Sequence, residues 1–350
     1  MRLISLLFVA LLSAPAMAQT VPSAEWAHPS PQASGWSASK LAEAKAFADG
    51  HDISAVMVVQ HGKVVAEWGN TDKPMELASI RKSLLDALIG IAVAQHKIDP
   101  GTTLQQADID DKPPSLSAQE KQATIRMLLE ARSGIYHPAL YETKAMAAAR
   151  PERFSHAPGT FWYYNNWDFN ALGTIYEKAI GISIYDAFEN QIARKIGMQD
   201  YDPRAQHKFF GAASIHPAYT FRMSTRDLAR FALLFLDGGR WNGEQIIPES
   251  WVRESTTPHS DADHGLGYGY LWWTGDAASP APKNVGENVF HLPAGSYFAW
   301  GAGGQYAFVV PHDDLVIVER TDRDLKMPSP RLHEVAGLID RICQAGHLEQ

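Results

Sequence analysis

The sequence predicts a mixed α/β (α+β) fold in which both ends of the chain build one antiparallel sheet and the middle forms a mostly helical lobe. Strand-like runs lie near the two ends, at residues 53–68, 296–310 and 315–320. Helical patterns flank them, at residues 37–49 and 328–345. Because each element must bury its apolar face against another, we expect these two terminal helices to cover the sheet.

The terminal elements follow from residue type and period. Residues 37–49 are rich in Ala and have helical periodicity. Two β-branched runs on either side of His61-Gly62 predict a hairpin within residues 53–68. The N-terminal part of the α/β unit is therefore expected to be a helix followed by a hairpin.

The middle of the chain is dominated by helical patterns and loops. The helical segments are residues 77–94, 124–131, 169–179, 185–196 and 225–236. We expect an α/β lobe at about residues 36–80 and 286–350, a helical lobe at about residues 81–285, and a cleft between them. Sites tend to lie in such clefts.

Composition narrows the class of protein. The chain has 350 residues, 45% of them hydrophobic and 20% charged, which is typical of a globular protein. The formal net charge is −8 and no basic block occurs, which argues against a nucleic-acid or anionic-membrane partner. Cys343 is the single cysteine, so an intrachain disulfide is excluded. Oligomeric state is not predicted.

The first eighteen residues have the pattern of a signal peptide. Arg2 supplies a positive start, residues 3–12 an apolar stretch, and Ala16-Met17-Ala18 a small-x-small cleavage site. Cleavage after Ala18 would leave residues 19–350 as one folded unit. We therefore expect a periplasmic or secreted protein without a stable membrane anchor after cleavage.

A serine and a lysine stand three residues apart at the start of the 77–94 helix. Ser79 and Lys82 share a helix face, so their side chains can meet. The helix is otherwise strongly apolar, so burial should lower the pKa of Lys82 and make a neutral amine available to activate the serine. The same spacing occurs at Ser37 and Lys40, where we interpret Ser37 as a helix N-cap.

A turn rich in tyrosine and asparagine precedes the 169–179 helix. A phenol beside a lysine ammonium has a lowered pKa, so a tyrosinate from Tyr163 or Tyr164 could act as a general base. An Asn amide could bridge the lysine and a substrate. The alternative is an aromatic turn that packs the core, with Asn165 or Asn166 capping the helix.

Small residues at 299–305 lead into a strand. Gly301 and Ala302 would let a substrate approach the backbone, and an exposed N–H there could hold an oxyanion. The alternative is a β-bulge or a tight corner.

In this order, the three elements resemble the serine β-lactamase and penicillin-binding superfamily. The resemblance is greatest to the class C-like branch, which includes esterases and 6-aminohexanoate-dimer hydrolases. Ser79 and Lys82 match the family's S-x-x-K motif, and Tyr164 and Asn166 match its Y-x-N motif. The resemblance covers nearly all of residues 37–350 and implies a β-lactamase/transpeptidase-like fold.

The resemblance also implies a reaction, namely acyl transfer through an acyl-enzyme on Ser79. Lys82 and Tyr164 would act as general base, and the N–H groups of Ser79 and Ala302 would hold the oxyanion. Asn166 would orient Lys82 or the substrate. The implied substrate is a small ester or amide, and neither a metal nor an organic cofactor is expected.

Several residues are candidates for the substrate pocket. Ala299-Trp300-Gly301 stands in the place of the family's third motif, where lactamases carry a cation. Ala299 supplies no cation, and the bulky Trp300 favours a neutral or differently shaped substrate. Tyr136, Trp162 and Trp272 are further candidates. The loops at residues 134–150 and 257–281 are expected to shape the pocket.

Three functions remain open at this point. The first is an exported serine hydrolase that acts on esters or amides. The second is a D,D-peptidase or β-lactamase, against which the absent third-motif cation counts. The third is a non-catalytic binding or sensor protein, which has no chemical need for Ser79, Lys82 and Tyr164 together.

Overall fold

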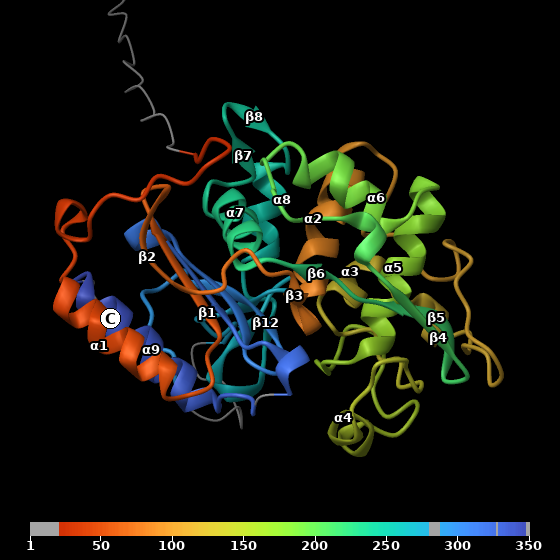
Figure 1. Cartoon of the computed structure of the whole chain (residues 1–350). Helices are drawn as coiled ribbons and strands as arrows, with labels where there is room; N and C mark the ends of the chain where they lie inside the picture. Colours follow the sequence, from red (N-terminus) through yellow and green to blue (C-terminus); the bar gives the residue numbers. More distant parts are fainter. Residues whose placement is uncertain (1–20, 280–287, 327, 348–350) are drawn as a thin grey trace, which may run out of the picture.

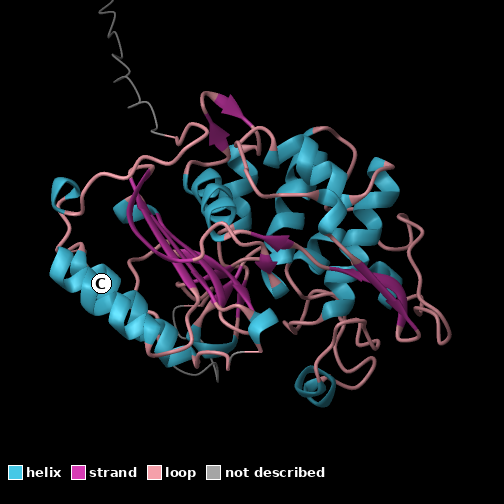
Figure 2. Cartoon of the chain, in the orientation of Figure 1, coloured by secondary structure: helices cyan, strands magenta, loops and turns pink. Residues whose placement is uncertain are grey.

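The computed structural model describes residues 21–279, 288–326 and 328–347, and its main element is an antiparallel sheet (Figure 1). The strand order is β2-β1-β14-β13-β12-β11-β10-β9. The bounds are β1 (Ala55–Gln60), β2 (Lys63–Gly69), β9 (Ser260–Asp261), β10 (Gly267–Tyr268), β11 (Trp273–Thr274), β12 (Tyr297–Gly301), β13 (Gln305–Val310) and β14 (Leu315–Arg320). Because β1 pairs with β14, strands from both ends of the chain lie side by side (Figure 2). The predicted fold class is confirmed. The proposed signal peptide, residues 1–18, lies outside the described residues.

The predicted hairpin at residues 53–68 is present as β1 and β2. Gln60 pairs with Lys63, and the two residues between them, His61 and Gly62, have φ angles of 51° and 69°. A two-residue turn with both φ angles positive matches the right-handed twist of the strands it joins. The His61-Gly62 turn therefore joins β1 to β2, as the sequence predicts.

The run at residues 296–310 differs from the prediction, because it is two strands and not one. β12 and β13 form a hairpin in which Gly301 pairs with Gln305. Gly303 and Gly304 in the turn have φ angles of 85° and 70°, which residues with a Cβ rarely adopt. Short hairpins outside the main sheet are β4 (Lys208–Gly211) with β5 (Ser214–Tyr219) and β7 (Arg240–Trp241) with β8 (Glu244–Gln245); β3 (Met75–Glu76) pairs with β6 (Arg222–Met223).

The helices match most of the predicted segments. They are α1 (Ala38–Asp49), α2 (Arg81–Ala94), α3 (Ile125–Leu129), α4 (Lys144–Ala149), α5 (Asn166–Ile180), α6 (Ile184–Phe188), α7 (Thr225–Leu236), α8 (Glu249–Ser255) and α9 (Leu332–Ala345). The predicted 185–196 segment is α6 followed by a π-turn at Glu189–Ala193. Ser37, Thr124 and Ser224 each accept a backbone N–H three residues ahead, which explains where α1, α3 and α7 begin.

The sheet has helices on both faces. α1 and α9 pack against each other on one side, as the sequence predicts, and α7 packs on β1, β13 and β14 from the other side (Figure 1). The predicted lobe boundary near residue 286 is wrong, because α7 and β9–β11 already belong to the sheet lobe. Their short strands gave no alternating pattern in the sequence.

The helical lobe is built around α2. Every residue of α2 from Arg81 to Ala92 is buried, and the helix packs on α5, α6 and α8. A helix that is buried on all sides can hold a polar side chain away from water. Within the described part of the chain, no helix has the length and apolar character of a membrane span.

The contact between α2 and α8 yields a stability prediction. A Cβ on Gly90 would lie 2.2 Å from the ring of Trp251, whose Nε1 donates to the backbone oxygen of Asp86 at 3.1 Å. Gly90→Ala should therefore lower the unfolding temperature. Overpacking costs about 1–3 kcal/mol, against a gain of about 1 kcal/mol from the better helix former. In the control Gly50→Ala the nearest atoms lie 3.6 Å away, and we expect little change. An unchanged or higher unfolding temperature for Gly90→Ala would contradict the prediction.

Candidate active site

Ser79 lies where the sheet lobe meets the helical lobe. It sits in the single turn η2 (Ala78–Ile80), which runs directly into α2 and packs against β12 and β13. Ala78, the residue before it, has a φ angle of 47°, in the left-handed region that costs energy for any residue with a Cβ. Strained backbone of this kind is often found at functional sites.

Lys82 connects the first two predicted motifs. Its Nζ lies 2.6 Å from Ser79 Oγ and 2.6 Å from Tyr164 Oη. One turn of helix separates Ser79 from Lys82, whereas Tyr164 comes from the loop before α5. The structure therefore brings the three predicted side chains into one hydrogen-bonded group.

The surroundings of Lys82 oppose a positive charge on it. The side chain is 2% exposed, and burial lowers the pKa of Lys82 well below its usual value. The neighbouring Arg81 guanidinium lowers the Lys82 pKa further. Arg81 is itself buried, donates to Asn170 Oδ1 at 3.1 Å, and lies 4.2 Å from the centre of the Tyr219 ring. This setting favours the neutral amine form of Lys82 over the charged ammonium.

The expected lowering of the tyrosine pKa is wrong. Burial raises the pKa of Tyr164 to about 12, and the smaller effects of Ser79 and Arg81 in the opposite direction do not cancel this rise. The expected lowering of the tyrosine pKa required a lysine ammonium beside the phenol. Burial disfavours that charge on Lys82 and also disfavours the tyrosinate, so Tyr164 remains a phenol.

The structure separates the two tyrosines of the motif. Tyr164 contacts Lys82, whereas the Tyr163 hydroxyl donates to the backbone oxygen of Met146 at 2.9 Å. Asn165 is the N-cap of α5, since its side chain accepts the N–H of Asp168. This places the Y-x-N register on Tyr164 and Asn166.

Asn166 lines the pocket but has no hydrogen bond to Lys82. Its Nδ2 donates to the backbone oxygen of Tyr141 at 2.6 Å. Its Oδ1 is buried and has no partner among the described residues. Of the two expected roles, the structure favours contact with a substrate over orientation of Lys82.

The end of β12 approaches the serine closely. A Cβ on Gly301 would lie 2.3 Å from the backbone oxygen of Leu77 and 3.2 Å from the nitrogen of Ser79. Only glycine fits there without displacing the η2 backbone. Ala302, the next residue, lines the same pocket as Ser79.

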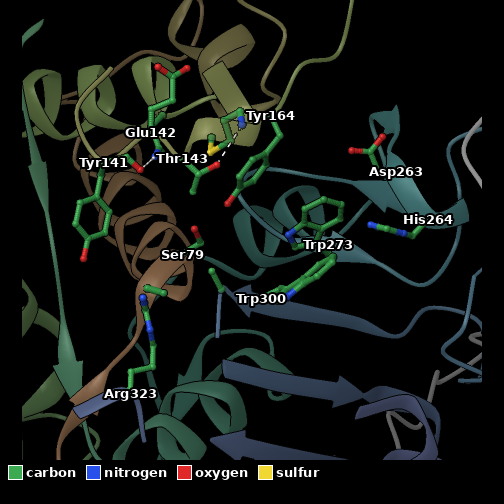
Figure 3. Close-up of a pocket in the computed structure, with 14 residues that line it drawn as sticks. Ser79, Tyr141, Glu142, Thr143, Tyr164, Asp263, His264, Trp273, Trp300 and Arg323 are labelled. Atoms are coloured by element: carbon green, nitrogen blue, oxygen red, sulfur yellow. Dashed lines mark hydrogen bonds between the residues drawn. The ribbon is translucent and has the colours of Figure 1, made fainter. Parts of the chain in front are cut away.

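Ser79, Tyr164, Asn166 and Ala302 border a cavity of about 530 Å³ (Figure 3). Trp300, from β12, forms part of its wall, and its ring lies 5.1 Å from that of Trp273, centre to centre. Both loops that were expected to shape the pocket line it. One contributes Asp263 and His264, and the other contributes Tyr141, Glu142, Thr143 and Met146.

Three predicted pocket aromatics lie elsewhere. Tyr136 is buried behind the pocket, 3.2 Å from His156 Nδ1 through its hydroxyl. Trp272 is a core residue that donates to Asp86 Oδ2 at 3.2 Å. Trp162 packs against Tyr268 and Trp273. The sequence could not distinguish core from pocket aromatics, because both occur in apolar segments.

Charged residues also line the pocket, and the sequence did not predict them. Arg323, on the turn η8 (Arg323–Leu325) after β14, lines it, although no cation occupies the third-motif position. Its Nη1 lies 3.7 Å from Glu76 Oε2. Glu142 and Asp263 also line the pocket. No motif marks these residues, since their loops have no periodic pattern.

The second S-x-x-K match is structural. Ser37 Oγ accepts the N–H of Lys40 at 3.4 Å, as a helix N-cap does. Lys40 Nζ donates to the backbone oxygen of Gln344, which ties α1 to α9.

Comparisons with known proteins show the same fold. A Bacillus anthracis protein provisionally named a 6-aminohexanoate-dimer hydrolase superposes with a TM-score of 0.62 at 22% identity, covering 87% of this chain and 83% of its own. A class C β-lactamase in complex with cefoxitin superposes with a TM-score of 0.61 at 14% identity, covering 90% and 98%. A penicillin-binding protein from Bacillus halodurans gives 0.60 at 16% identity, covering 85% and 99%.

A relative found by sequence is similar to most of the chain, and its name states no function. An uncharacterised protein of Alkalihalophilus pseudofirmus is 22% identical over 295 residues, which span 76% of this chain and 82% of that protein. The beta-lactamase family profile matches residues 44–336, a range that contains Ser79, Lys82, Tyr164 and the paired strands of both chain ends. The chain therefore belongs to the beta-lactamase family, within the superfamily of serine β-lactamases and penicillin-binding proteins.

Proposed function

We propose that this protein is an exported serine hydrolase that cleaves a small ester or amide through an acyl-enzyme on Ser79. The observation that carries the proposal is the position of the buried Lys82 Nζ, 2.6 Å from both Ser79 Oγ and Tyr164 Oη. A neutral amine in contact with a serine hydroxyl can accept its proton as the oxygen attacks. Family membership and fold support the hydrolase class.

In the first step Ser79 Oγ attacks the carbonyl carbon of the substrate while its proton passes to Lys82. Tyr164, a phenol, gives its proton to the leaving group as the C–O or C–N bond breaks, and Lys82 returns a proton to Tyr164. Water then attacks the acyl-enzyme with the same groups acting in reverse, which releases the acid and restores Ser79.

Two backbone N–H groups and one side-chain amide also act on the substrate in this mechanism. The N–H groups of Ser79 and Ala302 stabilise the oxyanion, in line with the close approach of Gly301 to the Ser79 nitrogen. The unpartnered Asn166 Oδ1 accepts a hydrogen bond from a substrate N–H or O–H. An amide or a hydroxylated ester would satisfy it.

The central test is covalent labelling of Ser79. Intact-mass measurement after treatment with a small fluorophosphonate should show one adduct on the mature protein and none on Ser79→Ala. The side chain of Ser79 lies at the pocket and is not part of the core, so the variant should keep the parent unfolding temperature. An unlabelled parent would overturn the proposed function.

The two tyrosines make a matched pair of variants. Tyr164→Phe should lower kcat by about 10²- to 10⁴-fold, as expected for loss of a proton-transfer group. Tyr163→Phe removes only a hydrogen bond to Met146 and should cost much less. If Tyr163→Phe were the more damaging change, the proton relay would be misassigned.

The charge of Arg81 predicts a shift in the pH profile. Because Lys82 must be neutral to accept a proton, kcat/KM should rise as pH passes upward through the Lys82 pKa. Arg81→Gln removes a charge that lowers this pKa, so the rise should move to higher pH, with a similar plateau. Arg81→Lys keeps the charge and serves as the control. Identical profiles for Arg81→Gln and the parent would exclude this electrostatic effect.

A further inference from the structure

The charged side chains around the pocket differ in whether they have partners. Glu142 pairs with Arg150, with Glu142 Oε2 2.6 Å from Arg150 Nη2. Arg323 faces Glu76 at 3.7 Å. Asp263 has neither a hydrogen bond nor an ion pair through its carboxylate within the described part of the chain. The charges of Glu142 and Arg323 are thus compensated, and the carboxylate of Asp263 is not.

Asp263 lies beside an aromatic wall. In Figure 3, Asp263 and His264 lie on the far side of Trp273 and Trp300 from Ser79. His264, whose φ angle of 64° is in the left-handed region, places its ring 5.7 Å from that of Trp300. Trp300 is supported by Tyr306, which stacks on it at 5.7 Å. The stacked Tyr306 ring supports Trp300 from one side, and Trp300 still lines the pocket.

An acidic group next to indole rings is a setting that attracts cations. A positive group is drawn to the face of a tryptophan, and to a lesser degree to tyrosine, by the ring quadrupole. The carboxylate adds a charge interaction that salt weakens.

We propose that the Asp263–Trp300–Trp273 wall is a subsite for a positively charged group, so that the preferred ester or amide carries an ammonium or quaternary ammonium substituent. This rests on the proposed function, because it assigns the substrate class of the same pocket. Asp263 and Trp300 act as specificity-determining residues and take no part in bond breaking.

The test compares isosteric pairs that differ only in charge. Methyl 4-(trimethylammonio)butanoate and methyl 5,5-dimethylhexanoate place the group on the acyl side, and acetylcholine and 3,3-dimethylbutyl acetate place it on the alcohol side. Dissociation constants are measured by calorimetry on Ser79→Ala, so that the esters stay intact. Measurements at about pH 8.5 lie above the range in which histidines ordinarily titrate.

The cationic member of at least one pair should bind about fivefold more tightly than its neutral isostere. Adding Asp263→Asn or Trp300→Leu to the Ser79→Ala protein should reduce that ratio of affinities toward one. High salt should also reduce the ratio, because it screens the charge of the Asp263 carboxylate. Glu43→Gln on the exposed face of α1 removes the same charge far from the pocket and should keep the ratio.

No preference in either pair would overturn the proposal. A preference that survives Asp263→Asn and Trp300→Leu, or that falls equally in Glu43→Gln, would also overturn it. Because binding is measured without an active serine, these outcomes are independent of the fluorophosphonate experiment. Failed labelling with a retained cation preference would refute the hydrolase assignment alone.

Discussion

The pairing of β14 with both β1 and β13 is the constraint on which the rest of the structure depends. It joins residues 55–60 to residues 315–320, so the whole intervening chain must leave and re-enter one sheet. The same closure brings Gly301 on β12 against the turn that carries Ser79, which no local interaction could do.

The site depends on an apolar setting for polar groups. α2 is buried on every side, and this removes Lys82 from water and lowers its pKa, which favours its neutral form. The same burial raises the pKa of Tyr164 to about 12. One physical effect thus assigns complementary roles, with an amine that can accept a proton beside a phenol that keeps one. Arg81, buried beside them and hydrogen-bonded to the neutral amide of Asn170, strengthens the effect on Lys82.

The pocket shows how one fold can be adapted to different substrates. Ser79 and Lys82 stand on η2 and α2, which are packed elements, and Trp273 and Trp300 stand on strands, whereas other parts of the pocket wall come from loops. Loop residues can change without disturbing the core. The paired charges of Arg323 with Glu76 and of Glu142 with Arg150 tie these loops down, and the indole wall of Trp273 and Trp300 gives the cavity its shape.

The sequence by itself determined the strand-like runs near both chain ends, the hairpin at His61-Gly62, the approximate limits of most helices and the spacing of Ser79 and Lys82. These features depend on period, capping and turn chemistry, which act over a few residues. Only the tertiary structure decided which tyrosine meets Lys82, that Tyr136 and Trp272 lie outside the pocket, and that Arg323 and Asp263 lie inside it. Those outcomes depend on contacts between segments far apart in the sequence, such as that of Arg323 with Glu76, and on burial, which sets a pKa only once the chain is folded.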